Sequence, residues 1–204
     1  TGKVTWTVRT KKRISANLIH TRSIKGEEII LAASEDGNLY AISAEGEVIW
    51  RTPTRGAIIA KPAILQTSPT AKEVLFGSTD NSLYCLDLED GEELWSYQTG
   101  FWVGCTPAIE KGEQYTYAIV GSYDANVYVL DAMGSYELDI IPGLGGVVNQ
   151  GTFRVRSMGS DAGQDKGKVS RKFHVHDFVV ASVYAAEDAV VAVTKKGKVY
   201  NLKL

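Results

Sequence analysis

Few residues of this chain have the types and spacing that chemistry requires. His174 and His176 are two positions apart, so a strand would place both imidazoles on one face, where such a pair can bind zinc or copper. A metal site needs further ligands, and His20 is the only other histidine in the sequence. We therefore expect exposed strand histidines and no metal.

The two cysteines, Cys85 and Cys105, form no CxxC motif. We expect each to be a small buried apolar residue, with a disulfide between them as the alternative. Serine, histidine and aspartate are all present, but no GxSxG sequence marks a nucleophile. The glycine-rich segment 143–146 lacks the Lys-Ser/Thr step of a phosphate-binding loop. The sequence thus predicts a protein that is not an enzyme and has no cofactor.

The aromatic pair Phe101-Trp102 is a candidate binding site. We match these positions to Ala57 and Ile58 of the preceding unit, so two large aromatic residues are not required by the repeat described below. Such residues are good anchors for a partner or ligand. Packing beneath a loop is the alternative.

Two groups of polar residues are further candidates. Lys61, Asn149 and Gln150 stand on expected inner strands, where they would line a channel or bind water. A basic stretch over 154–172 would grip an acidic partner or a phosphate backbone, with a solvated loop as the alternative. Its basic residues are Arg154, Arg156, Lys166, Lys168, Arg171 and Lys172. Because the formal net charge is −2, no global attraction to nucleic acid is expected.

Self-similarity along the chain sets the frame for these residues. Four segments are alike: LAASEDGNLYAIS, LFGSTDNSLYCLD, IVGSYDANVYVLD and VAVTKKGKVYNLK. Tyr40, Tyr84 and Tyr128 are 44 residues apart, and Tyr200 follows after 72. A period of this length, with several short strands in each unit, is typical of a β-propeller blade.

Each unit predicts antiparallel strands joined by tight turns. Asp36-Gly37 and Asp80-Asn81, with Asp124-Ala125 as a weaker case, suit two-residue type I′ turns, because these residues tolerate the positive φ that such turns demand. The strand after each turn is apolar on both faces, as in a sheet stacked between other sheets.

Recurrent tryptophans and aspartates have structural roles in this interpretation. We expect the indoles of Trp6, Trp50 and Trp95 to dock neighbouring blades, with Leu138 in the fourth such place. Asp87 and Asp131 are expected to accept hydrogen bonds from turn amides.

The two ends of the chain match each other. The end of the sequence, VYNLKL, lacks the outer strand that follows it in other units, and the start, TGKVTW, has the pattern of that strand. We therefore predict that the outer strand 1–8 completes the last blade and closes the ring.

These repeats resemble the PQQ-like repeat (quinoprotein-type) β-propellers. The resemblance lies in DGNLYAISAEGEVIW, DNSLYCLDLEDGEELW, DANVYVLDAMGSYEL and KGKVYNLKL plus TGKVTW. A Pro-Ala step on the inner strand appears at Pro62-Ala63 and Pro107-Ala108. The resemblance covers residues 1–146 and 178–204 and implies an all-β fold with four-stranded blades.

The blade count depends on one irregular region. Regular blades are expected over residues 14–52, 57–98 and 101–140, and the last blade over 178–204. Residues 147–177 depart from the pattern. They predict a degenerate fifth blade, a long hairpin inserted into four blades, or a ring that another chain completes, for example by self-association.

The resemblance also sets the expected function. Quinone-dependent dehydrogenases of this kind carry an adjacent Cys-Cys pair, and this chain has none. We expect a non-catalytic propeller that is a protein–protein interaction scaffold, with a small-ligand or carbohydrate-binding propeller as the alternative and a quinone-dependent oxidoreductase retained for testing. No apolar run reaches the roughly 20 residues of a membrane span. The resemblance favours a periplasmic, secreted or cell-surface location.

Overall fold

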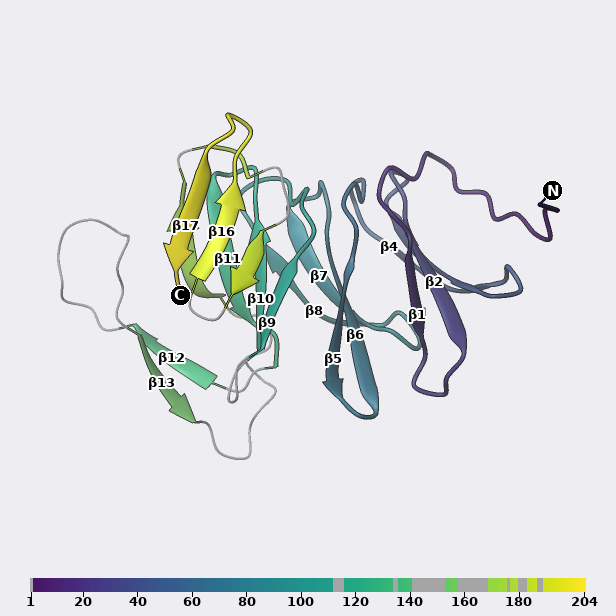
Figure 1. Ribbon diagram of the computed structural model, residues 1–204, viewed down its shortest axis with the longest axis horizontal. Coiled ribbons are helices and arrows are strands. Elements are labelled where there is room, and N and C mark those ends of the chain that lie inside the picture. Colours follow the sequence, from purple (N-terminus) through teal and green to yellow (C-terminus); the bar gives the residue numbers. More distant parts are fainter. Residues whose placement is uncertain are drawn as a thin grey trace.

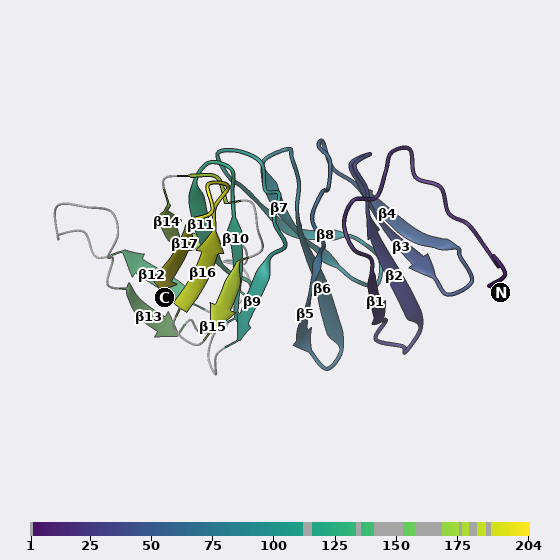
Figure 2. The ribbon, with the colours of Figure 1, turned by 45° about the horizontal axis from the view of Figure 1, so that its top comes forward.

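The computed structural model is an open fan of β-sheets (Figure 1). It describes residues 2–111, 116–133, 136–140, 153–157, 169–175, 177–179, 183–186 and 189–204. The first strands of neighbouring sheets lie side by side on the inner side of the fan, where β9 contacts both β5 and β15. This is the blade arrangement of a propeller whose ring is not closed (Figure 2).

The first two blades are regular four-stranded antiparallel sheets. Blade 1 contains β1 (Ile19–Arg22), β2 (Glu28–Ala33), β3 (Asn38–Ser43) and β4 (Val48–Pro53). Blade 2 contains β5 (Ala63–Ser68), β6 (Ala71–Gly77), β7 (Ser82–Asp87) and β8 (Glu93–Gln98). In each blade the third strand meets the fourth through the same bulge, between Ala41 and Ile42 and between Cys85 and Leu86. The repeated sequence therefore produces a repeated register.

Blade 3 takes its outer strand from further along the chain than expected. β9 (Ala108–Lys111), β10 (Thr116–Gly121) and β11 (Asn126–Asp131) are followed in the sheet by β14 (Val169–His174). The bulge recurs between Val129 and Leu130. Val129 pairs with Arg171, as Cys85 pairs with Trp95. Arg171, rather than Leu138, thus occupies the position in blade 3 that Trp95 occupies in blade 2.

Two strands of the irregular region form a separate sheet. β12 (Tyr136–Ile140) pairs with β13 (Phe153–Ser157) in a two-stranded sheet. The described residues contain the sheets of four blades and this separate two-stranded sheet. The choice among a degenerate fifth blade, an inserted hairpin and a ring that another chain completes stays a prediction. The two strands that carry Arg154 and Arg171 lie in different sheets, because β13 pairs with β12 and β14 pairs with β11. β14 has the register that the outer strand of blade 3 requires.

Blade 4 has three strands, and the predicted closure is not present. β15 (Tyr184–Ala186), β16 (Ala189–Val193) and β17 (Val199–Lys203) form its sheet. Residues 2–18 form no strand, and the N-terminus lies at the opposite end of the fan from β17 (Figure 1). The prediction that residues 1–8 complete the last blade is therefore wrong for this structure. The four blades span too little of a circle to bring the two segments together.

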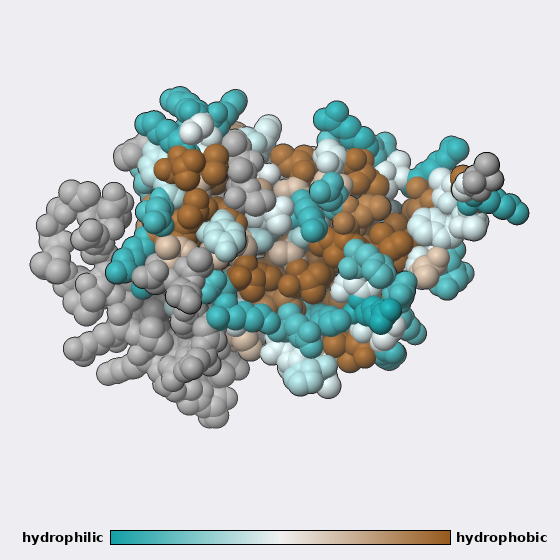
Figure 3. Space-filling model, viewed as in Figure 1, coloured by the Kyte–Doolittle hydropathy of each residue, from teal (hydrophilic) through white to brown (hydrophobic). Residues whose placement is uncertain are grey.

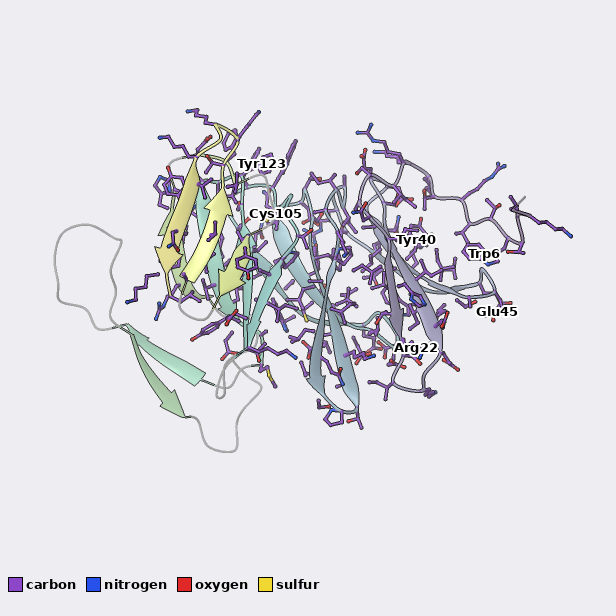
Figure 4. The ribbon with its side chains drawn as sticks, viewed as in Figure 1. Trp6, Arg22, Tyr40, Glu45, Cys105 and Tyr123 are labelled. Carbon is purple, nitrogen blue, oxygen red and sulfur yellow. The ribbon has the colours of Figure 1, made fainter. Side chains whose placement is uncertain are left out.

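Trp6 and Trp50 each pack on the glycine turn of the blade that follows them in the chain. Trp6 Nε1 donates a 2.9 Å hydrogen bond to Ala44 O, and Trp50 Nε1 donates one of the same length to Leu88 O. The ring of Trp50 lies so close to Gly91 that a Cβ there would be 2.6 Å from it. Figure 4 shows Trp6 beside Glu45 at the free edge of blade 1. The buried Trp95 Nε1 has no hydrogen-bond partner in the described part of the chain.

The turn between the second and third strands differs from the predicted type I′. Gly37 N donates to Ser34 O at 3.1 Å, and Ser34 N donates to Asn38 O at 3.1 Å, which encloses three loop residues. Gly37 has positive φ (85°), as do its counterparts Asn81, Ala125 and Gly197, and no positive φ is recorded for Asp36. This is a type I turn followed by one left-handed residue. The two-residue prediction was wrong because Asp36 supplies hydrogen bonds, not a left-handed backbone.

The core consists of apolar layers between neighbouring blades. Phe76 and Leu86 of blade 2 pack with Leu31 and Leu39 of blade 1. Leu83 and Trp95 pack with Val120 and Leu130 of blade 3, and a third layer joins blades 3 and 4. A strand that is apolar on both faces fits between two such layers. Within the described residues, no helix is long and apolar enough to cross a membrane.

Candidate functional site

One backbone hydrogen bond recurs where the chain enters each of the four blades. The residue after a buried Ser or Thr donates its N–H to the carbonyl of the incoming linker, and we call these contacts linker bridges 1 to 4. They are Glu35 N to Arg13 O at 3.0 Å, and, at 2.9 Å each, Thr79 N to Ala57 O, Tyr123 N to Trp102 O and Lys195 N to Phe178 O. The repeat therefore fixes the backbone on this face of the fan.

The side chains at the four linker bridges differ. Bridge 1 has an ion pair, with Arg13 Nε 2.6 Å from Glu35 Oε1. Bridge 2 is small, and Thr79 Oγ1 accepts a 2.7 Å hydrogen bond from Ala57 N. Bridges 3 and 4 carry aromatic rings. A constant backbone with variable side chains is a surface on which binding specificity can reside.

Aromatic residues at bridges 3 and 4 form a continuous row. Phe101 stacks on Trp102 with ring centroids 5.2 Å apart, and Trp102 is 6.0 Å from Tyr123 in a tilted contact. Tyr123 in turn stacks on Phe178 at 5.7 Å. We call these four residues the aromatic row. Figure 4 shows Tyr123 at one end of blade 3, beside blade 4.

The aromatic row is exposed on a rigid support. Phe101 is 43% exposed, and Trp102 and Phe178 are each 42% exposed. Phe101 O accepts hydrogen bonds from Thr99 Oγ1 at 2.5 Å and from Ser122 Oγ at 3.0 Å. Figure 3 shows other apolar residues, in brown, over the middle of the fan, with hydrophilic residues mainly along its rims. Exposed rings on a fixed backbone lose little conformational entropy when they bind a partner.

Aspartates at the hairpin turns fasten each linker to the next blade. Asp124 Oδ2 accepts hydrogen bonds from Tyr128 Oη at 2.5 Å and from Gly100 N at 2.8 Å, immediately before the aromatic row. Asp80 Oδ2 accepts from Tyr84 Oη at 2.8 Å and from Arg55 N at 3.0 Å. We call each such carboxylate, with Asp36 as the first, an aspartate latch.

Two of the latch carboxylates, Asp36 and Asp124, have a lowered pKa. Partial burial alone would raise the pKa of Asp36, but hydrogen bonds from Asn38, Lys11 N and Tyr40 outweigh it and lower the pKa to about 2. The balance of burial and hydrogen bonds also lowers the pKa of Asp124. The same partnership raises the pKa of Tyr84 to about 12, because burial and the nearby Asp80 both disfavour the phenolate. These acids and phenols are structural.

Blade 4 reverses the latch. Lys196 stands where the other blades have aspartate, and its backbone N donates a 2.9 Å hydrogen bond to Asp177 Oδ2 of the linker. Sequence reasoning treated these aspartates only as turn residues. The signal that could have found the latch is the spacing Asp-x-x-x-Tyr, which occurs at Asp36, Asp80 and Asp124 and is absent before Tyr200.

The matched positions of the aromatic pair need a correction of one residue. Val103 N donates a hydrogen bond to Ser78 O, and Ile58 N donates one to Ser34 O. Each acceptor is the buried serine of the preceding blade. Phe101 and Trp102 therefore correspond to Gly56 and Ala57, not to Ala57 and Ile58. Pro62 and Pro107 are 45 residues apart, whereas the repeated tyrosines are 44 residues apart. The spacing of the prolines therefore gives the corrected match.

The structure separates the other predicted site residues. Lys61 is exposed in the linker before β5. Its position in the repeat comes after Gly56 and Ala57, the residues that match the aromatic pair. Arg154 and Arg156 lie on β13, whereas Arg171 lies on β14 of blade 3. Asn149, Gln150 and Lys168, like Lys166 of the basic stretch, lie outside the described residues. The described part of the basic stretch is thus divided between the sheet of β12 and β13 and blade 3.

The cysteines and histidines show no shared site. Cys85 and Cys105 are buried and form no disulfide, and burial raises the pKa of Cys105 to about 11, so the Cys105 thiol is not a reactive thiolate. His174 Nδ1 lies 3.3 Å from Asn126 Oδ1, and His176 lies outside the described residues. Among the residues that the structure describes, no group of three His, Cys, Asp or Glu side chains could hold a metal ion. Asp87 and Asp131 do accept turn amides, from Glu89 N and Met133 N.

Sequence comparison identifies a family. A family model described as outer membrane protein assembly factor BamB matches residues 1–137. The outer membrane protein assembly factor BamB of Nitrosomonas eutropha is 26% identical over 99 residues, which are 48% of this chain and 22% of that protein. The match therefore spans less than a quarter of that relative's length.

Structural comparison supports the same fold at low sequence identity. The computationally designed protein Ika4 has a TM-score of 0.60 and 13% identity, over 100% of this chain and 99% of its own. The WD40 repeats of RRP9 have a TM-score of 0.58 and 12% identity, over 95% of this chain and 52% of theirs. These likenesses show a propeller-like arrangement of blades.

Proposed function

Because the chain belongs to the family of the outer membrane protein assembly factor BamB, we propose that it is a non-catalytic β-propeller module that binds a protein partner through the aromatic row. The single observation that carries the proposal is the exposure of three rings of this row on a hydrogen-bonded backbone. Aromatic anchors dominate binding energy when they are held in a fixed orientation.

The non-catalytic part of the proposal is supported by where the reactive groups point. The latch carboxylates of Asp36, Asp80 and Asp124 bind backbone amides and tyrosine hydroxyls, and both thiols are buried. Incubation with pyrroloquinoline quinone and calcium, followed by gel filtration, tests the quinone alternative. We expect no bound chromophore in the absorbance spectrum, and a retained chromophore would refute this part.

The proposed location follows from the family. A relative whose name places it in outer membrane assembly suggests work in the periplasm, next to other assembly proteins. Family membership supports this location only for the class of protein, so the partner must be found by experiment.

A peptide selection tests the binding proposal. Phe101→Gly with Trp102→Ala gives bridge 3 the residues of bridge 2, which the fold already accepts at that position. We expect peptides selected from a random display library on the native chain to bind this double variant at least about tenfold more weakly, with an unchanged melting temperature.

The matched control is Lys12→Ala with Arg13→Ala, at bridge 1 on the same face. Its affinity for the selected peptides should equal that of the native chain. If the selected peptides bind the bridge 3 variant as tightly as the native chain, or if no peptide is enriched, the aromatic row is not the interaction site.

A further inference from the structure

The aromatic row ends against a lysine-rich turn. Lys195 Nζ lies 5.9 Å from the ring centroid of Phe178, a cation–π contact. Lys195, Lys196 and Lys198 are all exposed. The backbone hydrogen bond from Lys195 N to Phe178 O holds this turn against the row at 2.9 Å. Apolar rings and positive charges therefore form one continuous surface.

The carboxylates nearest this surface are bound to backbone amides. Asp177 accepts hydrogen bonds from Phe178 N at 2.8 Å and Lys196 N at 2.9 Å, and Asp124 accepts one from Gly100 N at 2.8 Å. In the described part of the chain, no carboxylate forms an ion pair with Lys195, Lys196 or Lys198. The three ammonium groups are available to an anionic partner.

The geometry of the rings selects the kind of group that can approach. Phe101 and Trp102 are parallel within 12°, and Tyr123 and Phe178 within 8°. Each ring of the row therefore has one face against a neighbouring ring, and Lys195 also lies over the ring of Phe178. Aromatic edges carry partial positive charge and attract carbonyl and carboxylate oxygens. Bases of single-stranded nucleic acid instead stack on open ring faces.

We propose that the aromatic row and the turn Lys195–Lys198 form one site for an extended acidic peptide that carries apolar side chains. The inference rests on the proposed function and specifies its partner. Apolar side chains of the peptide pack along the ring edges between Phe101 and Phe178. Its carboxylates meet the lysines at the blade 4 end.

Fluorescence anisotropy with labelled synthetic peptides tests the site. The probes are a peptide in which Phe alternates with Asp, the same peptide with Lys for Asp, and the same peptide with Ser for Phe. We expect the native chain to bind the Phe-Asp peptide at least about tenfold more tightly than either other peptide. Added salt should weaken this binding.

Charge reversal at the turn separates this inference from the general function. Lys195→Glu with Lys198→Glu should weaken the Phe-Asp peptide about tenfold or more, since two exposed charges are inverted. Lys11→Glu with Lys12→Glu, on the same face without adjacent rings, is the matched control and should change affinity less than about twofold.

Each outcome decides between the two ideas. If selected peptides depend on Phe101 and Trp102 but not on the lysines, the acidic-peptide inference fails and the interaction function stands. If neither group matters, both fail. If single-stranded oligothymidylate binds more tightly than the Phe-Asp peptide, the inference is overturned in favour of nucleic acid.

Discussion

At linker bridge 2, Gly56 and Ala57 cross Thr79, whereas at bridge 3, Phe101 and Trp102 cross Tyr123. The bridging hydrogen bond is 2.9 Å long in both. A Cβ at Gly56 would collide with Asp80 N, so bridge 2 excludes a side chain that bridge 3 displays. The turns of the two blades thus share their hydrogen bonds, whereas their outward side chains differ. The binding site proposed above lies among these outward side chains.

The tryptophan docks show the same contrast between blades. Trp50 Nε1 has Leu88 O as its partner, whereas the buried Trp95 Nε1 has none among the described residues. Blade 3 is also the blade whose outer strand is β14, which follows β12 and β13 in the chain. The indole that docks blade 1 on blade 2 thus has a hydrogen bond that the indole of blade 2 lacks in the described part of the chain.

The largest expected effect is on the shared scaffold. Gly91→Ala combines a left-handed backbone (φ 75°) with a Cβ only 2.6 Å from the Trp50 ring, and should cost about 3 kcal/mol of unfolding free energy. Gly26→Ala has positive φ but nothing within 4 Å, and should cost about 1 kcal/mol. Urea unfolding measures both. Equal losses would show that the dock does not depend on this close approach.

The latches of Asp80 and Asp124 should contribute equally to the free energy of unfolding, but only the latch of Asp124 should affect peptide affinity. Asp80→Ala and Asp124→Ala each remove hydrogen bonds to a tyrosine and to a linker amide, and each should cost about 2 kcal/mol. Only Asp124→Ala should also weaken the Phe-Asp peptide, because Gly100 precedes Phe101. Urea unfolding and anisotropy give the two readouts. A similar loss of affinity in both variants would contradict the local role of bridge 3.

The latches also predict acid sensitivity. The folded chain lowers the pKa of Asp36 to about 2 and lowers that of Asp124. Their stabilising effect is therefore complete above the unfolded carboxyl pKa of about 4 and is lost as pH falls toward about 2. Thermal unfolding across this range should show a smaller loss in Asp36→Asn with Asp124→Asn. An unchanged pH dependence in that variant would exclude the latches as its source.

The smallest effect concerns the left-handed turn residue. The turn at bridge 2 contains Asn81 (φ 77°), and the turn at bridge 3 contains Ala125 (φ 66°). Alanine tolerates this left-handed conformation less well than asparagine. Ala125→Gly should stabilise the chain by about 1 kcal/mol, and Asn81→Gly by only a few tenths, roughly 0.3 kcal/mol. Chemical unfolding distinguishes them. An equal gain from both would mean that Ala125 is not strained.

Much of the fold followed from the sequence because the repeat is local. The recurrence of Tyr40, Tyr84 and Tyr128 predicted blades, and the recurrence of Trp6 and Trp50 predicted their docks. The aromatic pair also stood out, because the repeat does not require it. Its partners did not: Tyr123 and Phe178 are far from Phe101 in the chain, and only the linker bridges bring them together.

The sequence by itself determined the strands of blades 1 and 2, the places of the turns between them and the apolar layers between blades, since each depends on side-chain pattern over a few residues. Tertiary structure decided which strand completes blade 3, because β14 and the segment 136–140 are both extended and only pairing with β11 distinguishes them. It also decided that the ends do not meet, since closure depends on the summed angle between blades. No short stretch of sequence encodes that angle.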